Sequence, residues 1–381
     1  MYYHSHYVTP DWRETTVAAM AQMAHAHRAG LDECTRRAIF PRDLYRAMAA
    51  RGWVGPMTPV EYGGLGGSVH EYCLIEEEVG RLGLVSPQIS IQGQLWLNLW
   101  GSAEQKARYL AGMAQGEIIF AEAISEPGMG SSFKLMRAAA RRIGDDWILD
   151  GRKTHVNLGS QADLMIFYAL AEEGLTSFLV DAREPGIATR QTDPIGLRLI
   201  PTADVNLDGV RVPHAALLGR PGEGVKTFLS TFNISRLGNA SELIGFGRRA
   251  LAEAIVYARG RRVDDEHVVT DFQGIQWTVA DCYGLLYAAS LARDRAAELA
   301  RLGERHELET TLAKKLAIDA SERSVNDAFA LIGGYGLYEE TPFRQLLCDM
   351  KVLRVAGGSL EILRNYIARR VFKSETCEEL M

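Results

Sequence analysis

The sequence contains little cysteine and no cysteine motif. An odd number of cysteines, five, is spread over 381 residues without a Cys-x-x-Cys pair: Cys34, Cys73, Cys282, Cys348 and Cys377. This pattern excludes a disulfide framework and a zinc site, since both need paired or closely spaced cysteines. We therefore expect reduced thiols in a cytoplasmic protein, and no bound metal.

Segments that would direct the chain to a membrane are also missing. The first residues, MYYHSHYVTPDW, have neither the charged region nor the apolar core of a signal peptide, and no uninterrupted apolar run reaches membrane-spanning length. We expect a soluble protein with no membrane partner.

The sequence has no excess of positive charge. Its 42 Lys and Arg are outnumbered by 48 Asp and Glu, which gives a net charge of -6. Basic pairs such as Arg141-Arg142 and Arg369-Arg370 are scattered, so each is expected to lie on a solvated face. This distribution argues against a nucleic-acid partner.

The first third of the chain has the apolar spacing of helices. Residues 11 to 116 alternate such segments with Gly and Pro punctuation, which predicts a helical N-terminal domain over 1–117. The acidic run Glu76 to Glu78 is expected at a solvated helix edge, because its apolar neighbours keep helical spacing. The predicted helices are Thr15–Arg28, Arg42–Arg51, Val69–Leu82 and Ala103–Gln115.

From Ile118 the pattern changes to short β-rich runs. Turn signals recur at strand-like intervals, which favours a compact antiparallel sheet or barrel as a middle domain over 118–218. The signals are Gly144-Asp145, Asp150-Gly151 and Asp208-Gly209.

Long amphipathic runs return after the middle region. Residues 225–259 and 272–302 keep 3.6-residue apolar spacing and predict a helical C-terminal domain over 219–381. The predicted fold class is therefore α+β. An outward apolar stripe on these helices would serve as an oligomer interface.

The stretch LRVAGGSLEILR, residues 353–364, predicts the wall of a ligand site. Gly357 and Gly358 allow close backbone approach, and Ser359 begins a helix-prone run whose free N–H groups can hold a polar atom. The alternative is a plain connector, in which the glycines end one helix and Ser359 caps the next.

Six segments, in this order, resemble the acyl-CoA dehydrogenase family, and the resemblance runs from about residue 40 to 372. It implies a helical N-terminal domain, a β-barrel middle domain, a C-terminal four-helix bundle, bound FAD, a homotetramer or dimer, and an electron-transfer partner. The segments are AEAISEPGMGSS (121–132), GRKTHVNLGSQADL (151–164), FLVDAREPGI (178–187), IGLRLIPTADVNLDGVRVPHAALLG (195–219), FQGIQWTVAD (272–281) and LIGGYGLYEETP (331–342).

In the loop after residue 123, hydroxyls and free N–H groups beside proline and glycine suit hydrogen bonds to a flavin edge and a thioester. The resemblance assigns Ile124, Ser125 and Gly130 to the flavin and places Ser131 at both flavin and substrate. The alternative for this loop is an ordinary connection between strands.

Further along, His155 stands where the family usually has Trp, and Asn157 where it has Thr or Ser. His155 could stack on the flavin and transfer a proton, or it could be a structural histidine.

The resemblance assigns a second set of residues to the adenine and pyrophosphate of FAD. The family pattern Arg-x-x-Phe-Gly keeps Arg261 but loses Phe-Gly to an acidic run ending at His267, which would repel a diphosphate. Ala330 replaces a common glutamine. The assigned residues that remain are Arg261, Gln273, Gly333, Gly334 and Gly336.

The resemblance also shows that the usual catalytic base is missing. Gly357 occupies the position of the glutamate that removes the substrate α-proton, and Ser359 that of a flavin-contacting threonine. Isovaleryl-CoA-type members carry the glutamate elsewhere, at the position of Ser235, before an arginine that matches Arg236 and is assigned to the substrate. A serine cannot act as this base without first losing its own proton.

Two other residues are weak candidates for the base. Glu242 follows Ser235 by seven residues, on the same helix face but about 10 Å away. Glu361 is better explained as a first-turn carboxylate that complements the helix dipole. The catalytic base, if the protein has one, is left open among His155, Glu242 and a water molecule.

Three functions therefore compete. The leading hypothesis is a flavin-dependent oxidoreductase acting on an acyl thioester carried by coenzyme A or a carrier protein. The second is a redox-neutral reaction that releases CO2 or a sulfinate, as in the similar desulfinase-type members, with Arg81 as a candidate partner for the leaving anion. The third is a scaffold that has lost FAD.

Overall fold

A computed structural model describes residues 7–373 of the chain, so Cys377 lies outside the described residues. Contacts divide the chain into two compact units. The first, which we call the helical unit, comprises Met1–Ala26, Val69–Leu84 and Asn233–Met381. The second, the sheet unit, comprises His27–Ser68 and Val85–Phe232.

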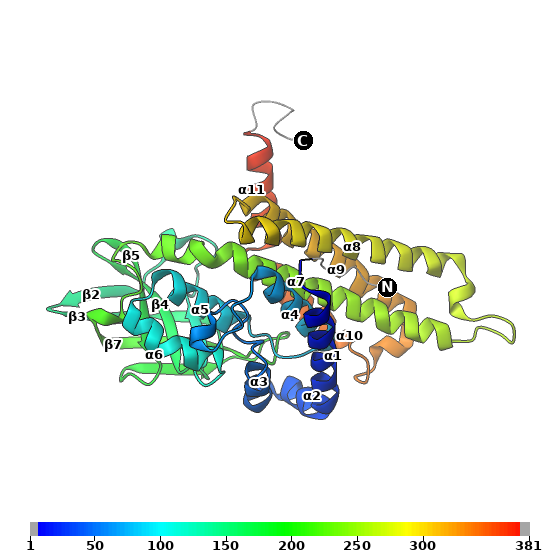
Figure 1. Ribbon diagram of the computed structural model, residues 1–381, viewed down its shortest axis with the longest axis horizontal. Coiled ribbons are helices and arrows are strands. Elements are labelled where there is room, and N and C mark those ends of the chain that lie inside the picture. The colour runs from blue at the N-terminus through cyan, green and yellow to red at the C-terminus, as the bar shows by residue number, and fades with distance from the viewer. Residues whose placement is uncertain (1–6, 374–381) are drawn as a thin grey trace. The chain divides into compact units, whose positions relative to one another are not determined.

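The predicted succession of helical, β-rich and helical regions is confirmed (Figure 1). The boundaries of three domains at 1–117, 118–218 and 219–381 stay a prediction. No helix of the described chain is long and apolar enough to cross a membrane. The cysteines at 34, 73, 282 and 348 form no disulfide.

The helical unit is built around α9, which packs against α8, α10 and α11. Helix α4 packs against α8 and also against α1. The helices are α1 (Pro10–Ala26), α4 (Val69–Leu82), α7 (Gly224–Gly260, in this unit from Asn233), α8 (Gln273–Arg301), α9 (Glu307–Ile332), α10 (Phe343–Val355) and α11 (Leu360–Val371).

Helices α4 and α7 approach each other backbone to backbone. A Cβ on Gly80 would lie 2.3 Å from the carbonyl oxygen of Glu242, and a Cβ on Gly245 would lie 2.2 Å from that of Glu77. Only glycine fits at such distances, so these two residues set the spacing of the helix pair.

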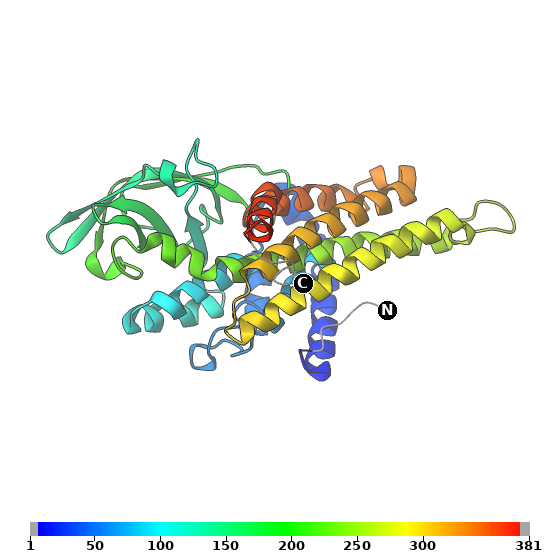
Figure 2. The same ribbon diagram turned by 90° about the horizontal axis from the view of Figure 1, so that it is seen from above.

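The sheet unit combines four helices with a curved seven-stranded sheet (Figure 2). Its helices are α2 (Arg28–Arg37), α3 (Arg42–Ala49), α5 (Gln88–Trp100) and α6 (Ala103–Ala114). Its strands are β1 (Phe120–Ala123), β2 (Ala139–Ile143), β3 (Asp146–Asn157), β4 (Leu164–Ala171), β5 (Gly174–Asp181), β6 (Ile187–Gln191) and β7 (Thr202–Pro213).

The sheet is mixed rather than antiparallel, which corrects the prediction. The strand order is β1-β4-β2-β3-β7-β6, with β5 also paired to β4, and β4 runs parallel to both β1 and β2. Parallel pairs need long connections, and short turn signals gave no indication of them.

Two of the three predicted turns are absent from their expected places. Gly144-Asp145 does connect β2 to β3, but Asp150-Gly151 and Asp208-Gly209 lie opposite each other inside β3 and β7. The ladder shifts register there, and the Gly209 amide donates a hydrogen bond of 2.7 Å to Asp150 Oδ1. Asp-Gly pairs suit such a β-bulge as well as a turn.

Each face of the sheet contributes to a separate core. Ala121 and Ala123 of β1 belong to a cluster with Trp147, Phe167 and Phe178. Phe120, on the other face, belongs to a cluster that includes α5 and α6 residues. Helix α5 was not among the predicted helices, because it is buried around most of its circumference and carries no amphipathic stripe.

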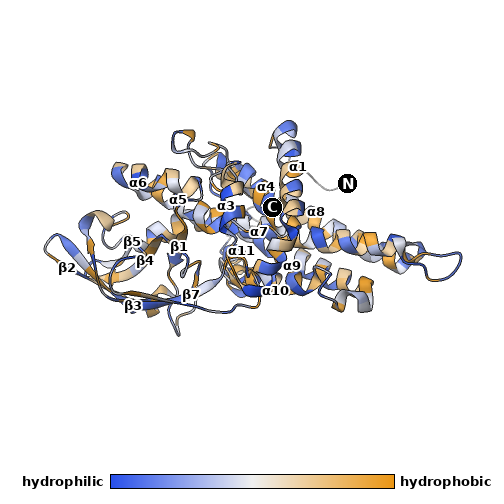
Figure 3. Cartoon of the chain, turned by 90° about the horizontal axis from the view of Figure 1, so that it is seen from below, coloured by the Kyte–Doolittle hydropathy of each residue, from blue (hydrophilic) through white to orange (hydrophobic). Residues whose placement is uncertain are grey.

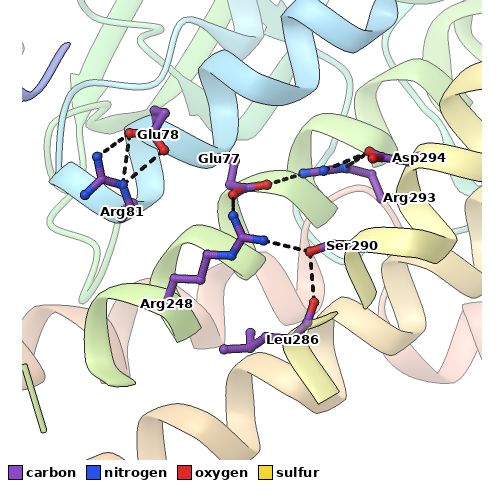
Figure 4. A network of polar contacts seen from close by, with 8 residues as sticks. All are labelled: Glu77, Glu78, Arg81, Arg248, Leu286, Ser290, Arg293 and Asp294. Carbon is purple, nitrogen blue, oxygen red and sulfur yellow. Dashed lines mark hydrogen bonds and ion pairs between the residues drawn. The ribbon is translucent and has the colours of Figure 1, made fainter. Parts of the chain in front are cut away.

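The acidic run of α4 is buried, so the prediction of a solvated edge is wrong. Glu76, Glu77 and Glu78 are 0%, 3% and 5% exposed. Glu77 accepts ion pairs from Arg248 of α7 and Arg293 of α8 (Figure 4). Arginines distant in sequence therefore make this burial possible, and a local pattern cannot reveal them.

The Glu77 network continues through α8. Arg248 Nη2 donates to Ser290 Oγ at 3.1 Å, and Arg293 Nε donates to Asp294 Oδ1 at 2.8 Å. Glu78, by contrast, pairs only within its own helix, with Arg81, whose side chain is 29% exposed.

Glu77→Gln should therefore destabilise the protein by about 3–5 kcal/mol, since it replaces the carboxylate shared by two buried arginines with an uncharged amide. Urea unfolding followed by circular dichroism measures the change. Glu78→Gln is the matched control on the same helix and should cost about 1 kcal/mol or less. Equal losses in the two variants would contradict the role given to the Glu77 network.

Candidate functional site

In the helical unit, the predicted glycine loop is held by cationic side chains through its carbonyl oxygens. Arg236 Nε donates to the Gly357 oxygen at 3.1 Å. Lys314 Nζ donates to the oxygens of Ala356 and Gly358. Three consecutive carbonyls are thus fixed from α7 and α9, which determines how the loop enters α11.

Ser359 follows the loop as the N-cap residue of α11, with extended backbone and no side-chain cap bond. The first N–H groups of a helix lack carbonyl partners within it and can bind a polar ligand atom. Gly357 and Gly358 have φ of +65° and +96°, so this bend requires glycine. The structure therefore fits both the connector and the site-wall interpretation of this stretch.

Lys314 was not identified by sequence reasoning. It is 0% exposed, and burial, followed by the charge of Arg236, lowers its pKa to about 7. A lysine in a helix with a second lysine beside it suggests a solvated face. The burial of Lys314 could have been predicted from its helical spacing with Thr310, Ala317 and Ser321, which are buried on the same face of α9.

The space at position 357 is already filled. A Cβ on Gly357 would lie 2.4 Å from Asn239 Nδ2 and 3.1 Å from Lys314 Nζ. Asn239 is buried, at 3% exposed, so a side chain at position 357 would have to displace its amide within the protein interior. The surroundings of Gly357 are therefore shaped for glycine, with two nitrogen groups beside it and no carboxylate.

The other residues proposed around the base lie on α7. Ser235 is 6% exposed, and Arg236 is 9% exposed with its pKa lowered to about 10 by burial. Glu242 is 3% exposed. Burial first, and then the charges of Glu76 and Asp349, raise the pKa of Glu242 well above its usual value.

A buried carboxyl of this kind makes stability depend on pH. In the unfolded chain Glu242 ionises near pH 4.5, while in the folded protein it keeps its proton to higher pH. Stability should therefore fall as pH rises above about 4.5, by up to about 1.4 kcal/mol per pH unit for one proton. Glu242→Gln should flatten this slope in urea unfolding measured between pH 5 and 7. An unchanged slope would show that Glu242 ionises normally.

In the sheet unit, a buried ion pair fixes the loop after β1. Glu126 is 5% exposed and accepts hydrogen bonds from the amides of Arg137 (2.7 Å) and Ala138 (3.0 Å) and from Lys153 Nζ (2.9 Å). Burial opposes ionisation, but the bonds from Lys153 and Ala138 lower the pKa of Glu126 overall. Burial likewise lowers the pKa of Lys153 to about 8, although Glu126 opposes this shift.

The same pair anchors the predicted flavin residues. Lys153 Nζ also donates to the Ile124 oxygen at 3.0 Å, and the Ser125 oxygen accepts from the Thr154 amide at 2.8 Å. Ile124 and Ser125 are half-buried, while Gly130 and Ser131 are exposed. The loop thus has a fixed start and an accessible tip.

His155 lies at a β-bulge of β3. The register with β7 shifts between Lys153 and Val156, and His155 has φ of +55°, a left-handed backbone that non-glycine residues rarely adopt. Its side chain is exposed, and that of Asn157 is half-buried. The bulge therefore turns His155 out of the strand ladder, on the strand that also carries Lys153.

The residues assigned to adenine and pyrophosphate lie at helix ends in the helical unit. Arg261, Gln273, Gly333 and Gly334 are exposed, and no atom would lie within 4 Å of a Cβ at either glycine. Gly336 differs, because a Cβ there would meet the Phe329 ring at 3.1 Å.

In the loop that follows Arg261, part of the acidic run forms hydrogen bonds within the loop itself. Asp264 accepts from the amides of Glu266 and His267. These backbone hydrogen bonds, with one from the His267 side chain, lower the Asp264 pKa.

Three further features bear on the predictions. Arg81 pairs with Glu78, and the exposed Glu361 pairs with Arg354 at 3.0 Å. A surface cavity of about 680 Å³ in the sheet unit, lined by residues such as Trp100, Tyr109 and His214, contains none of the predicted residues. Among residues 7–373, no group of three or more His, Cys, Asp or Glu side chains is arranged to hold a metal.

The structure therefore gathers the predicted residues into local groups. Arg236, Gly357, Gly358 and Ser359 are brought together in the helical unit, and Ile124 and Ser125 lie beside β3 in the sheet unit. Glu242 is buried, and the charges of Glu76 and Asp349 act on it.

Three family models match consecutive parts of the chain. They are acyl-CoA dehydrogenase, N-terminal domain, over residues 11–117; the middle domain over 121–210; and the C-terminal domain over 222–372.

The chain is 33% identical over 354 residues to a 3-(aryl)acrylate reductase of Clostridium sporogenes, covering 90% of this chain and 93% of the relative. It is 31% identical over 340 residues to an acyl-CoA dehydrogenase of Bacillus subtilis, covering 87% and 89%. The crystal structure of the prolyl acyl carrier protein oxidase AnaB is similar with a TM-score of 0.90 and 25% identity, covering 96% of this chain and 100% of that one.

Proposed function

Because the chain belongs to the acyl-CoA dehydrogenase family of oxidoreductases, we propose that it is an FAD-dependent enzyme acting on an acyl thioester carried by coenzyme A or by an acyl carrier protein. The observation that carries the proposal is the glycine loop, whose three carbonyls are held by Arg236 and Lys314 ahead of the α11 N-terminus. The carrier protein is included because a similar structure is a carrier-protein oxidase.

The residues present fit FAD in both units. In the sheet unit, Ile124, Ser125, Gly130, Ser131, His155 and Asn157 offer backbone groups, hydroxyls and an imidazole that are at least partly accessible. In the helical unit, Ser359, Arg261, Gln273, Gly333 and Gly334 are a second set of residues proposed to bind FAD, and open space surrounds both glycines. When bound, FAD supplies an acceptor for a pair of electrons.

The chain's own residues would hold and orient the substrate. Arg236 and Ser131 are proposed to bind it, with Arg236 fixed by its bonds to Gly357 and Asn233. No carboxylate stands at Gly357 or Ser235, so proton removal from the α-carbon would fall to His155 or to water. Glu242 is a poorer choice, because its carboxyl is buried beside two other acids.

The same loop favours a second candidate function. A reaction that releases CO2 or a sulfinate needs no base at the α-carbon, and the packing of Asn239 and Lys314 at Gly357 leaves no room for one. Arg81 is a weak partner for the leaving anion, since Glu78 already pairs with it.

We also propose that the protein is a homo-oligomer. Helix α8 exposes Trp277, Tyr287 and Leu291, which are 62%, 41% and 43% accessible, and hydrophobic residues are interspersed along the helix in Figure 3. A molar mass near 42.1 kDa by light scattering would contradict this assembly.

Purified protein should be yellow and should contain FAD. Anaerobic titration with a panel of saturated acyl thioesters should bleach the flavin absorbance if the protein is a dehydrogenase. Release of CO2 from a carboxylated acyl thioester, or of sulfite from a sulfinated one, without bleaching would support the second candidate function. Colourless protein that takes up no added FAD would refute both enzymatic functions and leave the scaffold.

Restoring a glutamate at position 357 should require a second change. Gly357→Glu alone places a side chain at φ +65° and against Asn239, so it should lower the stability by about 2 kcal/mol without raising dehydrogenation. Gly357→Glu with Asn239→Ala removes the contact, and it should raise the bleaching rate by roughly 10²-fold. Asn239→Ala alone is the control. If the single variant is as active as the double variant, Asn239 does not block a side chain at this position.

A further inference from the structure

A carboxyl and a phenol share one face of the sheet. Ala121 and Ala123 of β1 point into one core cluster, so Glu122 lies on the opposite face with Phe120. Glu122 pairs in register with Ile166 of the parallel strand β4, and Tyr168 is the next residue of β4 on that face. Both residues belong to the sheet unit.

Neither polar side chain forms a hydrogen bond or an ion pair with another residue of the described chain. Within residues 7–373, the buried Tyr168 hydroxyl has no hydrogen-bond partner, and the side chain of Glu122, which is half-buried, makes no hydrogen bond or ion pair. Burial raises the pKa of Glu122 to about 8. Burial, followed by the charge of Glu122, raises the pKa of Tyr168, so the two groups are close enough to interact. Leaving the buried Tyr168 hydroxyl unsatisfied costs free energy, which a bound ligand would recover.

Aromatic rings pack around Tyr168. The Tyr168 ring lies 6.4 Å from Trp96 and 6.2 Å from Phe228, and Phe228 lies 5.0 Å from Phe133 and 4.7 Å from Phe232. A carboxylate among aromatic faces is the combination that binds a cationic nitrogen, because the ring faces and the carboxylate both attract positive charge.

The pair also lies next to the loop proposed to hold flavin and thioester. Ile124, Met129 and Phe133 of that loop pack against the same core cluster as Tyr168. Glu122 precedes Ser125 by three residues of extended chain, a distance of about 10 Å. An acyl group of four to six atoms, by ordinary bond lengths of roughly 1.25 Å per atom along the chain, spans about half to three quarters of that distance.

We propose that Glu122 and Tyr168 bind a positively charged nitrogen on the acyl group, so that the substrate class is an amine-bearing acyl thioester. This inference rests on the proposed function for the thioester and extends it to the acyl group. Glu122 and Tyr168 are then specificity-determining residues, which touch the far end of the substrate.

The protonation state of Glu122 provides an independent measure of its contact with the bound cation. Tyr168 on β4 is the titratable group that interacts with Glu122. Burial alone accounts for the raised pKa of Glu122, so no charged side chain of α5, β3 or β4 shifts the pKa of this carboxyl. At pH 7 the free carboxyl is mostly protonated. A bound cation stabilises the ionised form, so binding at pH 7 should release close to one proton.

The test compares two pantetheine thioesters of the same shape, 4-(trimethylammonio)butanoyl and 5,5-dimethylhexanoyl, which differ in one positive charge. Isothermal titration into wild-type protein should give at least about 10-fold tighter binding of the cationic thioester. Repeating the titration in buffers of different ionisation enthalpy measures the released proton. Glu122→Gln should abolish both the preference and the proton release.

Two control variants complete the experiment. Glu173→Gln, at an exposed position of the same unit, should leave the preference unchanged. Tyr168→Phe keeps the carboxyl and should weaken the preference without removing it, so the proposal stays testable if Glu122→Gln folds poorly.

Equal affinity for the two thioesters, or an unchanged preference in Glu122→Gln, would overturn the proposal. Tighter binding of a hydroxyl-bearing acyl thioester than of the cationic one would overturn the assignment of a charged nitrogen. Loss of the proposed function has a different signature, because protein without flavin is recognised by its absorbance, whereas the titration reports binding alone.

Discussion

The helical unit depends on keeping one carboxylate, that of Glu77, charged and out of water. Removal of a carboxylate from water costs several kcal/mol, and the two guanidinium groups of Arg248 and Arg293 offset that cost. The close backbone contacts at Gly80 and Gly245 hold α4 against α7, so that the three charges stay together. The same contacts fix the position of α7 along its axis, and with it Arg236 and Asn239, which face the glycine loop.

The packing around the glycine loop supports the proposal that no glutamate acts at position 357. Asn239 and Lys314 occupy the space around Gly357, and Arg236 and Lys314 bind the loop's carbonyls. A glutamate placed there would lie beside two cations, which would lower its pKa and weaken it as a base. The proposed chemistry of this site therefore depends on a group of residues, of which Gly357 is only one.

Much of the fold could be predicted from the sequence, because apolar spacing and turn residues act locally. Helix α5 was not predicted, because a helix buried on most sides has no polar stripe. The parallel pairing of β1 with β4 was not predicted either, because it joins segments 40 residues apart. The run Glu76 to Glu78 was assigned to solvent because Arg293 is 216 residues away. Ser125 and Gly357 were proposed as site residues because they stand in short motifs, which can be recognised from local sequence. Lys314, Asn239 and Glu122 were missed, since their importance comes from neighbours that only the folded chain supplies.

The separation of Glu77 from its partners also sets an order of events during synthesis. Helix α4 leaves the ribosome early, whereas Arg248 and Arg293 follow only after the whole sheet unit, which ends at Phe232, has been made. The sheet unit can therefore fold on the ribosome while the glutamates of α4 are still solvated, because their arginine partners have not yet been made. A nascent chain that stops before Arg293 contains every strand of the sheet but not the second arginine, so the helical unit is the last part to become protected from proteases and aggregation.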